Sequence, residues 1–226
     1  MTEAEWLACA DPAPMVEFLM GKASDRKLRL FACTCCRRVW HLLTDARSRR
    51  AVEVIERYVD GLATEKELDA ASDAAIFAAD ELNASSLPAA IVAASSAPEY
   101  ATAAEGYTAH AAACAIAYSN YGDVTPGTLD PLECVAQSAL LRDLFVPFRP
   151  VTLDPAWRTP TATALATAAY EERHLPAGIL DTQRLAVLAD ALEDAGCTDE
   201  QILAHLRGPG PHIRGCWVID LLLGKE

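Results

Sequence analysis

Apolar residues recur along most of the chain at the three- and four-residue spacing of amphipathic helices. The strict alternation that marks a half-buried strand is missing, and only "FRPVTL" at 148–153 looks extended. One extended segment makes no sheet. The pattern predicts helices at residues 3–9, 13–21, 26–44, 46–60, 65–82, 88–95, 98–119, 131–144, 160–172, 182–195, 199–206 and 214–223. We therefore expect an all-α protein, an irregular bundle of about ten to twelve helices with an alanine-rich middle segment.

Residues suited to helix ends support these ranges. The pairs that fit a capping box are Thr2 with Glu5, Thr64 with Glu67, and Thr198 with Gln201. Asp130–Pro131 and Thr159–Pro160 each place an N-cap residue before a proline at the first helical position. Gly61 and Gly196 stand where a helix is expected to stop.

The helix predicted at 26–44 has a clear apolar side. A helical wheel places Leu28, Phe31, Ala32, Cys35, Val39, Leu42 and Leu43 on one arc. The wheel turns Arg37, Arg38 and His41 away from that arc. We therefore expect this helix to bury one side and to expose a basic ridge on the other.

The chain is expected to form three parts, 1–62, 63–122 and 123–226, within one compact domain. The middle part is rich in alanine, with 21 of the 48 residues from Ala70 to Ala117. Alanine favours helices but buries little area. This segment is therefore either an extended spacer arm or a tightly packed helix pair anchored by its tyrosines.

Charge is unevenly distributed along the chain. The net charge of −13 argues against nonspecific binding to nucleic acid or to an anionic membrane. From Lys22 to Arg50, however, nine basic residues stand against two acids, a local balance of +7. Either this basic ridge packs beside acidic segments of the same chain, or Arg37 and Arg38 bind an acidic protein partner.

No apolar run is long enough to span a membrane, and the first residues lack the basic start of a secretory signal. We expect a cytoplasmic protein whose eight cysteines are free thiols. Cys33 and Cys36 are one helical turn apart and could bind one metal ion together. Structural zinc needs four ligands, and His41 lies about 12 Å along the axis from Cys33. The sequence therefore predicts no metal and no other cofactor.

The last segment, "HLRGPGPHIRGCWVIDLLLGKE", holds the other candidate chemistry. In a helix, His212, Cys216 and Asp220 would share one face, as a thiol nucleophile requires, but Cys216 would then separate the acid from the histidine. The loop could instead hold an anion with the basic side chains Arg207, His212 and Arg214. The large apolar residues favour a third interpretation, a buried helix that locks the core.

Asp220 is expected to be buried among those apolar residues. A lone buried carboxylate is costly, and arginine is a suitable partner for it. Because Arg214 falls on the wrong side of the same helix, we expect the partner to come from elsewhere, as Arg37, Arg38 or Arg149.

Four segments carry a resemblance to a known family. They are "KASDRKLRLFACTCCRRVWHLL", "FRPVTLDPAW", "LADALEDAGC" and "GPGPHIRGCWVIDLLLGKE". Together they resemble a paralogous family of hypothetical proteins that is abundant in planctomycete bacteria. The resemblance implies a bacterial cytoplasmic setting, and it carries over no catalytic residue because the family has no established activity.

These observations favour a non-enzymatic intracellular helical protein that acts as a protein-interaction module. The alternatives are a metal-binding or thiol-dependent protein, using Cys33 and Cys36 or the His212–Cys216–Asp220 face, and an anion site at the Gly208–Gly215 loop.

Overall fold

The computed structural model describes residues 1–81, 128–148 and 151–225. The predicted all-α fold is confirmed, with ten α-helices and one short 3-10 helix in these residues. In the same residues the only β-type pairings are two isolated bridges, His174 with Ile179 and Ile179 with Ile213. The chain divides into an N-terminal unit, Met1–Ser138, and a C-terminal unit, Ala139–Glu226. The boundary lies within one helix rather than after residue 62 or residue 122.

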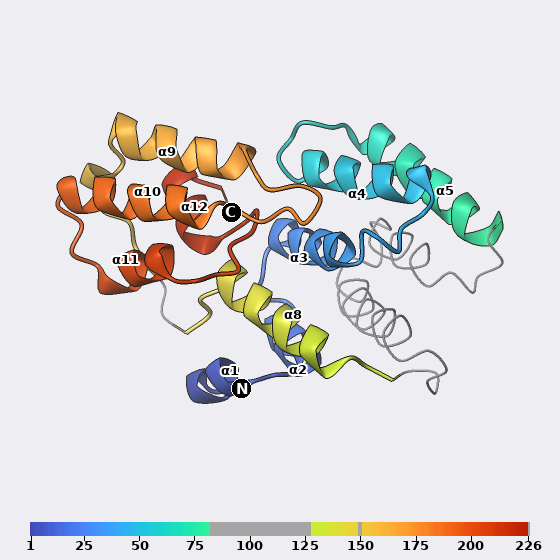
Figure 1. The fold of residues 1–226 in the computed structure, drawn as a ribbon, viewed down its shortest axis with the longest axis horizontal. Helices are drawn as coiled ribbons and strands as arrows, with labels where there is room; N and C mark the ends of the chain where they lie inside the picture. The colour runs from blue at the N-terminus through green and yellow to red at the C-terminus, as the bar shows by residue number, and fades with distance from the viewer. Residues whose placement is uncertain (82–127, 149–150, 226) are drawn as a thin grey trace. The chain divides into compact units, whose positions relative to one another are not determined.

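The N-terminal unit contains α1 (Glu3–Ala8), α2 (Pro12–Leu19), α3 (Asp25–Arg38), α4 (Ala46–Tyr58), α5 (Glu65–Glu81) and most of α8 (Pro131–Leu144). Helix α4 packs against both α3 and α5 (Figure 1). The core of the N-terminal unit is formed by side chains including Met15, Leu19, Leu30, Phe31, Leu43, Ile55 and Leu68. The apolar arc expected for the helix at 26–44 is buried except for Leu42, which is partly exposed.

The C-terminal unit contains the end of α8, the 3-10 helix η2 (Pro155–Trp157), α9 (Pro160–Glu171), α10 (Thr182–Asp194), α11 (Glu200–Arg207) and α12 (Trp217–Leu223). Helix α9 packs against α10 and α12, and α10 packs against α11 (Figure 1, orange to red). Buried leucine, alanine and isoleucine side chains from these four helices form one apolar core. Trp217, Val218 and Ile219 belong to it, which agrees with a core-locking final helix.

Several helix ends follow the predicted caps. Thr2 and Glu5 form the complete capping box at the start of α1. Gly196 follows the end of α10 and has a φ of 87°. The expected cap Thr198 is wrong: the Asp199 side chain accepts from the backbone N–H of Gln201 and Ile202 instead. A carboxylate one position later can accept both N–H groups, so α11 begins at Glu200.

Two predicted helices are shorter than expected. Helix α3 ends at Arg38 instead of residue 44. The chain continues from there in turns, in which Val39 and Leu43 are still buried. Helix α12 starts at Trp217 rather than at 214. The helices expected at 88–95 and 98–119, and the tyrosines of the alanine-rich segment, lie outside the described residues.

None of the helices in the described ranges combines the length and the apolar character of a membrane-spanning segment. This agrees with the absence of a long apolar run in the sequence.

Candidate functional site

Arg37 and Arg38, the two arginines of the ridge expected on the helix at 26–44, lie in ion pairs within the N-terminal unit. The Arg37 side chain is only 5% exposed, and its guanidinium donates to both carboxylate oxygens of Glu56. The wheel-based prediction of a surface Arg37 is therefore wrong. A helical wheel describes one helix alone. In the structure, α4 packs against the side of α3 that carries Arg37. Arg38 is partly exposed, with 31% of its side chain accessible, and donates to Glu133 of α8.

The cysteines of α3 serve as buried packing residues. Cys33 and Cys36 are 1% and 0% exposed. Burial raises the pKa of the Cys33 thiol well above its ordinary value, so a reactive thiolate is disfavoured there. His41 is exposed on the turn after the helix. No disulfide joins the cysteines in the described part of the chain.

The remaining sequence candidates are separated from one another in the structure. Arg207 pairs with Asp190 and Glu193 at the surface, and the Arg214 guanidinium lies 4.7 Å from the Tyr170 ring centre. The anion-binding loop expected from Arg207, His212 and Arg214 is therefore not assembled. Its three basic side chains contact separate groups.

Asp220 is 1% exposed, so its predicted burial is confirmed. Two of the arginines named as its partners pair elsewhere, Arg37 with Glu56 and Arg38 with Glu133, and Arg149 lies outside the described residues. The expected His212–Cys216–Asp220 face does not form, because α12 begins after Cys216.

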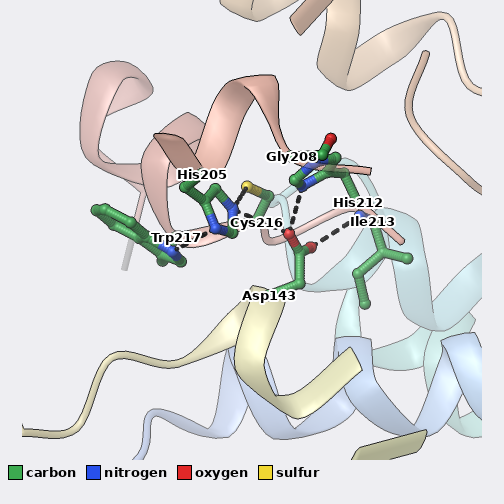
Figure 2. A network of polar contacts seen from close by, with 7 residues as sticks. All are labelled: Asp143, His205, Gly208, His212, Ile213, Cys216 and Trp217. Atoms are coloured by element: carbon green, nitrogen blue, oxygen red, sulfur yellow. Dashed lines mark hydrogen bonds and ion pairs between the residues drawn. The ribbon is translucent and has the colours of Figure 1, made fainter. Parts of the chain in front are cut away.

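A different acid completes a site in the C-terminal unit. Asp143, His205, His212 and Cys216 form a polar cluster in which one ligand-type atom of each lies within 4.8 Å of all the others. Asp143 Oδ1 lies 2.8 Å from His212 Nδ1 and 3.1 Å from His205 Nε2. Cys216 Sγ lies 3.2 Å from the same His205 Nε2. Figure 2 shows the Asp143 carboxylate pointing from the end of α8 toward both imidazole rings.

Four separate parts of the unit position these side chains. Asp143 stands in the last turn of α8, and His205 in the last turn of α11. His212 lies on the loop between α11 and α12, and Cys216 is the residue directly before α12. The loop is held in place because Asp143 Oδ2 accepts from the Ile213 backbone N–H at 2.8 Å.

Glycine is needed where the loop turns toward His212. Gly210 has a φ of 79°, and a Cβ there would lie 2.8 Å from the His212 backbone nitrogen. An L side chain would therefore meet both backbone strain and a steric clash. The glycine at this point of "GPGPH" therefore helps to fix the position of His212.

The cluster contains a buried ion pair. Burial by itself would raise the pKa of Asp143, but hydrogen bonds from His205 and His212 outweigh it, and the pKa lies below its usual value. Burial likewise would lower the pKa of His212, yet the contact with Asp143 dominates and the pKa is raised. His212 Nε2 also lies 3.3 Å from the Gly208 carbonyl oxygen, so both ring nitrogens face acceptors. This arrangement favours a carboxylate beside an imidazolium.

Cys216 is suited to metal ligation rather than to nucleophilic catalysis. Burial raises the pKa of its thiol well above the ordinary value, and the Asp143 carboxylate raises it further. The side chain is fully buried, so no substrate reaches it. A catalytic cysteine needs a lowered pKa and access, whereas a metal ion can displace the proton directly.

An open pocket of about 250 Å³ adjoins the cluster within the C-terminal unit. Asp143, His205 and His212 line one side of it, and the loop from Gly208 to Pro211 lines another. Small solutes and ions therefore have a route to Asp143, His205 and His212, whereas Cys216 is buried and does not line the pocket.

Sequence reasoning missed Asp143 and His205. Asp143 stands 69 residues before His212 along the chain, so no local pattern connects them. His205 offered a usable signal, since His205, His212 and Cys216 fall within one stretch, "HLRGPGPHIRGC". Three ligand-type residues at such short spacing are a recognisable sign of a zinc site.

Comparison with protein-family models, with curated proteins and with solved structures finds no match to this chain. The case for a function therefore depends on the polar cluster itself.

Proposed function

We propose that the C-terminal unit binds one zinc ion through Asp143, His205, His212 and Cys216. The observation that carries this proposal is the convergence of these four ligand-type atoms, from four parts of the chain, to within 4.8 Å of one another. Three of the four residues are buried, and His205 keeps 18% of its side chain exposed beside the pocket. Three of the ligands come from one stretch of the chain, while Asp143 stands 69 residues before His212, so it is the tertiary fold that completes the set.

The spacing suits a tetrahedral ion. Zinc bonds of about 2.0–2.3 Å place neighbouring ligand atoms about 3.3–3.8 Å apart. The measured separations of 2.8 Å, 3.1 Å and 3.2 Å are those of hydrogen bonds. These three pairs need to open by about 0.1–1 Å, and a pair at the 4.8 Å limit of the cluster needs to close by about 1–1.5 Å.

The ligand types favour zinc over calcium and magnesium. A thiolate and two imidazoles are too soft for calcium or magnesium, which prefer oxygen ligands. One carboxylate in a four-coordinate set with them is a normal zinc environment. Gly208 supports the set, because its carbonyl holds the proton on His212 Nε2 and leaves Nδ1 to face the ion.

Charge also balances in both forms. Without metal, the cluster holds the Asp143 carboxylate and the His212 imidazolium, with a neutral Cys216 thiol. With zinc, two positive charges stand against the carboxylate and the Cys216 thiolate. The buried region is neutral either way, so binding adds no uncompensated buried charge.

The sequence predicted no metal, and its metal-binding alternatives used Cys33 with Cys36 or the His212–Cys216–Asp220 face. We assign zinc binding to the cluster and no catalysed reaction. The protein-interaction role expected from the sequence remains a second proposal, with less support because Arg37 and Arg38 form ion pairs within their own unit.

The first test is the metal content of the purified protein and of two matched cysteine variants. The wild type is expected to retain about one zinc per chain through gel filtration, and Cys216→Ser to bind at least about 100-fold more weakly, since loss of a supporting contact alone costs 10–100-fold. Cys197→Ser is the control, because Cys197 is also buried in this unit but lies outside the cluster. Equal zinc affinity in the wild type and Cys216→Ser would contradict the proposal.

Proton release tests the ligand set itself. Binding of zinc at neutral pH is expected to release about two protons, one from the Cys216 thiol and one from His212 Nδ1. Calorimetry in buffers with different ionisation enthalpies measures this number. Cys216→Ser should release about one proton fewer. Zinc binding without proton release would mean that other groups hold the ion.

A further inference from the structure

Trp217 contacts the polar cluster in a way that zinc binding has to change. Its indole Nε1–H donates to His205 Nδ1 at 3.2 Å. The two rings also stack obliquely, with centres 5.0 Å apart. Figure 2 shows the indole on the side of His205 that faces away from Asp143.

This hydrogen bond determines which nitrogen of His205 carries the proton. An indole N–H can only donate, so His205 Nδ1 must offer a lone pair. A neutral imidazole has one proton, which therefore sits on Nε2. Nε2 is the atom that lies 3.1 Å from Asp143 and 3.2 Å from Cys216. The nitrogen that faces the cluster is thus protonated when Trp217 is bonded to the ring.

Zinc needs the opposite tautomer. A metal ion takes the lone pair of Nε2, so the proton must move to Nδ1. Two N–H groups then face each other across the Trp217–His205 contact, and the hydrogen bond is lost. Zinc binding through His205 Nε2 therefore costs the free energy of the Trp217–His205 hydrogen bond.

We propose that Trp217 is a positioning residue that lowers the zinc affinity of the cluster and couples metal occupancy to the start of α12. Its indole stabilises the metal-free tautomer of His205, and zinc binding releases the indole. The inference rests on the zinc-binding function proposed above. It goes further in making the site a reversible one, in which the first residue of α12 responds to the metal.

The test compares zinc affinities of the wild type, Trp217→Phe and Trp157→Phe by competition with a chromophoric chelator. Phenylalanine keeps an aromatic ring but cannot donate. Trp217→Phe is expected to bind zinc about fivefold more tightly, the equivalent of one ordinary hydrogen bond. Trp157→Phe should bind like the wild type, since Trp157 packs against the core of the same unit outside the cluster.

An unchanged or weaker affinity in Trp217→Phe would overturn the inference and leave the zinc site standing. A wild type that binds no zinc would remove both. If Trp217→Phe does not fold, nitrogen-15 NMR of the wild type decides. The inference requires zinc to move the His205 proton from Nε2 to Nδ1 and to shift the Trp217 indole N–H away from its hydrogen-bonded position. A Trp217 resonance that zinc leaves unchanged would refute it.

Discussion

Asp143→Ala is expected to lower the free energy of unfolding of the C-terminal unit by about 3–5 kcal/mol in the presence of a chelator. The Asp143 side chain is 3% exposed, and its carboxylate accepts hydrogen bonds from His212 Nδ1 and from the Ile213 backbone N–H of the loop between α11 and α12. Its removal leaves the buried His212 imidazolium without its counter-charge and the Ile213 N–H without an acceptor. Native-state hydrogen exchange, read peptide by peptide, measures the loss in this unit.

Asp194→Ala is the matched control, because Asp194 is an exposed acid on α10 of the same unit. We expect it to change stability by less than about 0.5 kcal/mol. Asp143→Asn should fall between the two variants, since an amide keeps the shape and one acceptor but not the charge. Equal stability of Asp143→Ala and Asp194→Ala would show that the ion pair with His212 does not exist.

Arg37→Ala is expected to destabilise the N-terminal unit by about 3–5 kcal/mol. The side chains of Arg37 and Glu56 are each 5% exposed, so the variant removes a guanidinium that binds a buried carboxylate between α3 and α4. Arg37 of the basic ridge is therefore expected to stabilise its own unit. Replacing both partners, as Arg37→Met with Glu56→Leu, should cost much less, because buried pairs are often replaced by apolar side chains without loss.

The control for this experiment is Arg50→Ala on α4. Arg50 pairs with Glu53, but the two side chains are 57% and 47% exposed. Such pairs contribute about 0–1 kcal/mol. Thermal and denaturant unfolding of the three variants should therefore rank Arg37→Ala far below the others. An Arg37→Ala protein as stable as the wild type would return this residue to the surface and restore the case for an acidic partner.

The helices could be predicted from local features of the chain. Thr2 and Glu5, Asp130 before Pro131, and Thr159 before Pro160 all cap helices as expected. Apolar spacing and capping act over three or four residues, which is the distance at which a sequence is directly informative. The burial of Asp220 was predictable for the same reason, because its immediate neighbours are all large and apolar.

The partners of charged side chains could not be predicted in this way. A wheel correctly showed that Arg37 leaves the apolar arc, but only the packing of α4 on α3 made that side internal. The site has the same origin. His205, His212 and Cys216 are neighbours in the sequence, while the acid that joins them is Asp143 from α8 rather than Asp220. Local periodicity places residues on a face, and only the tertiary fold decides which distant side chain that face meets.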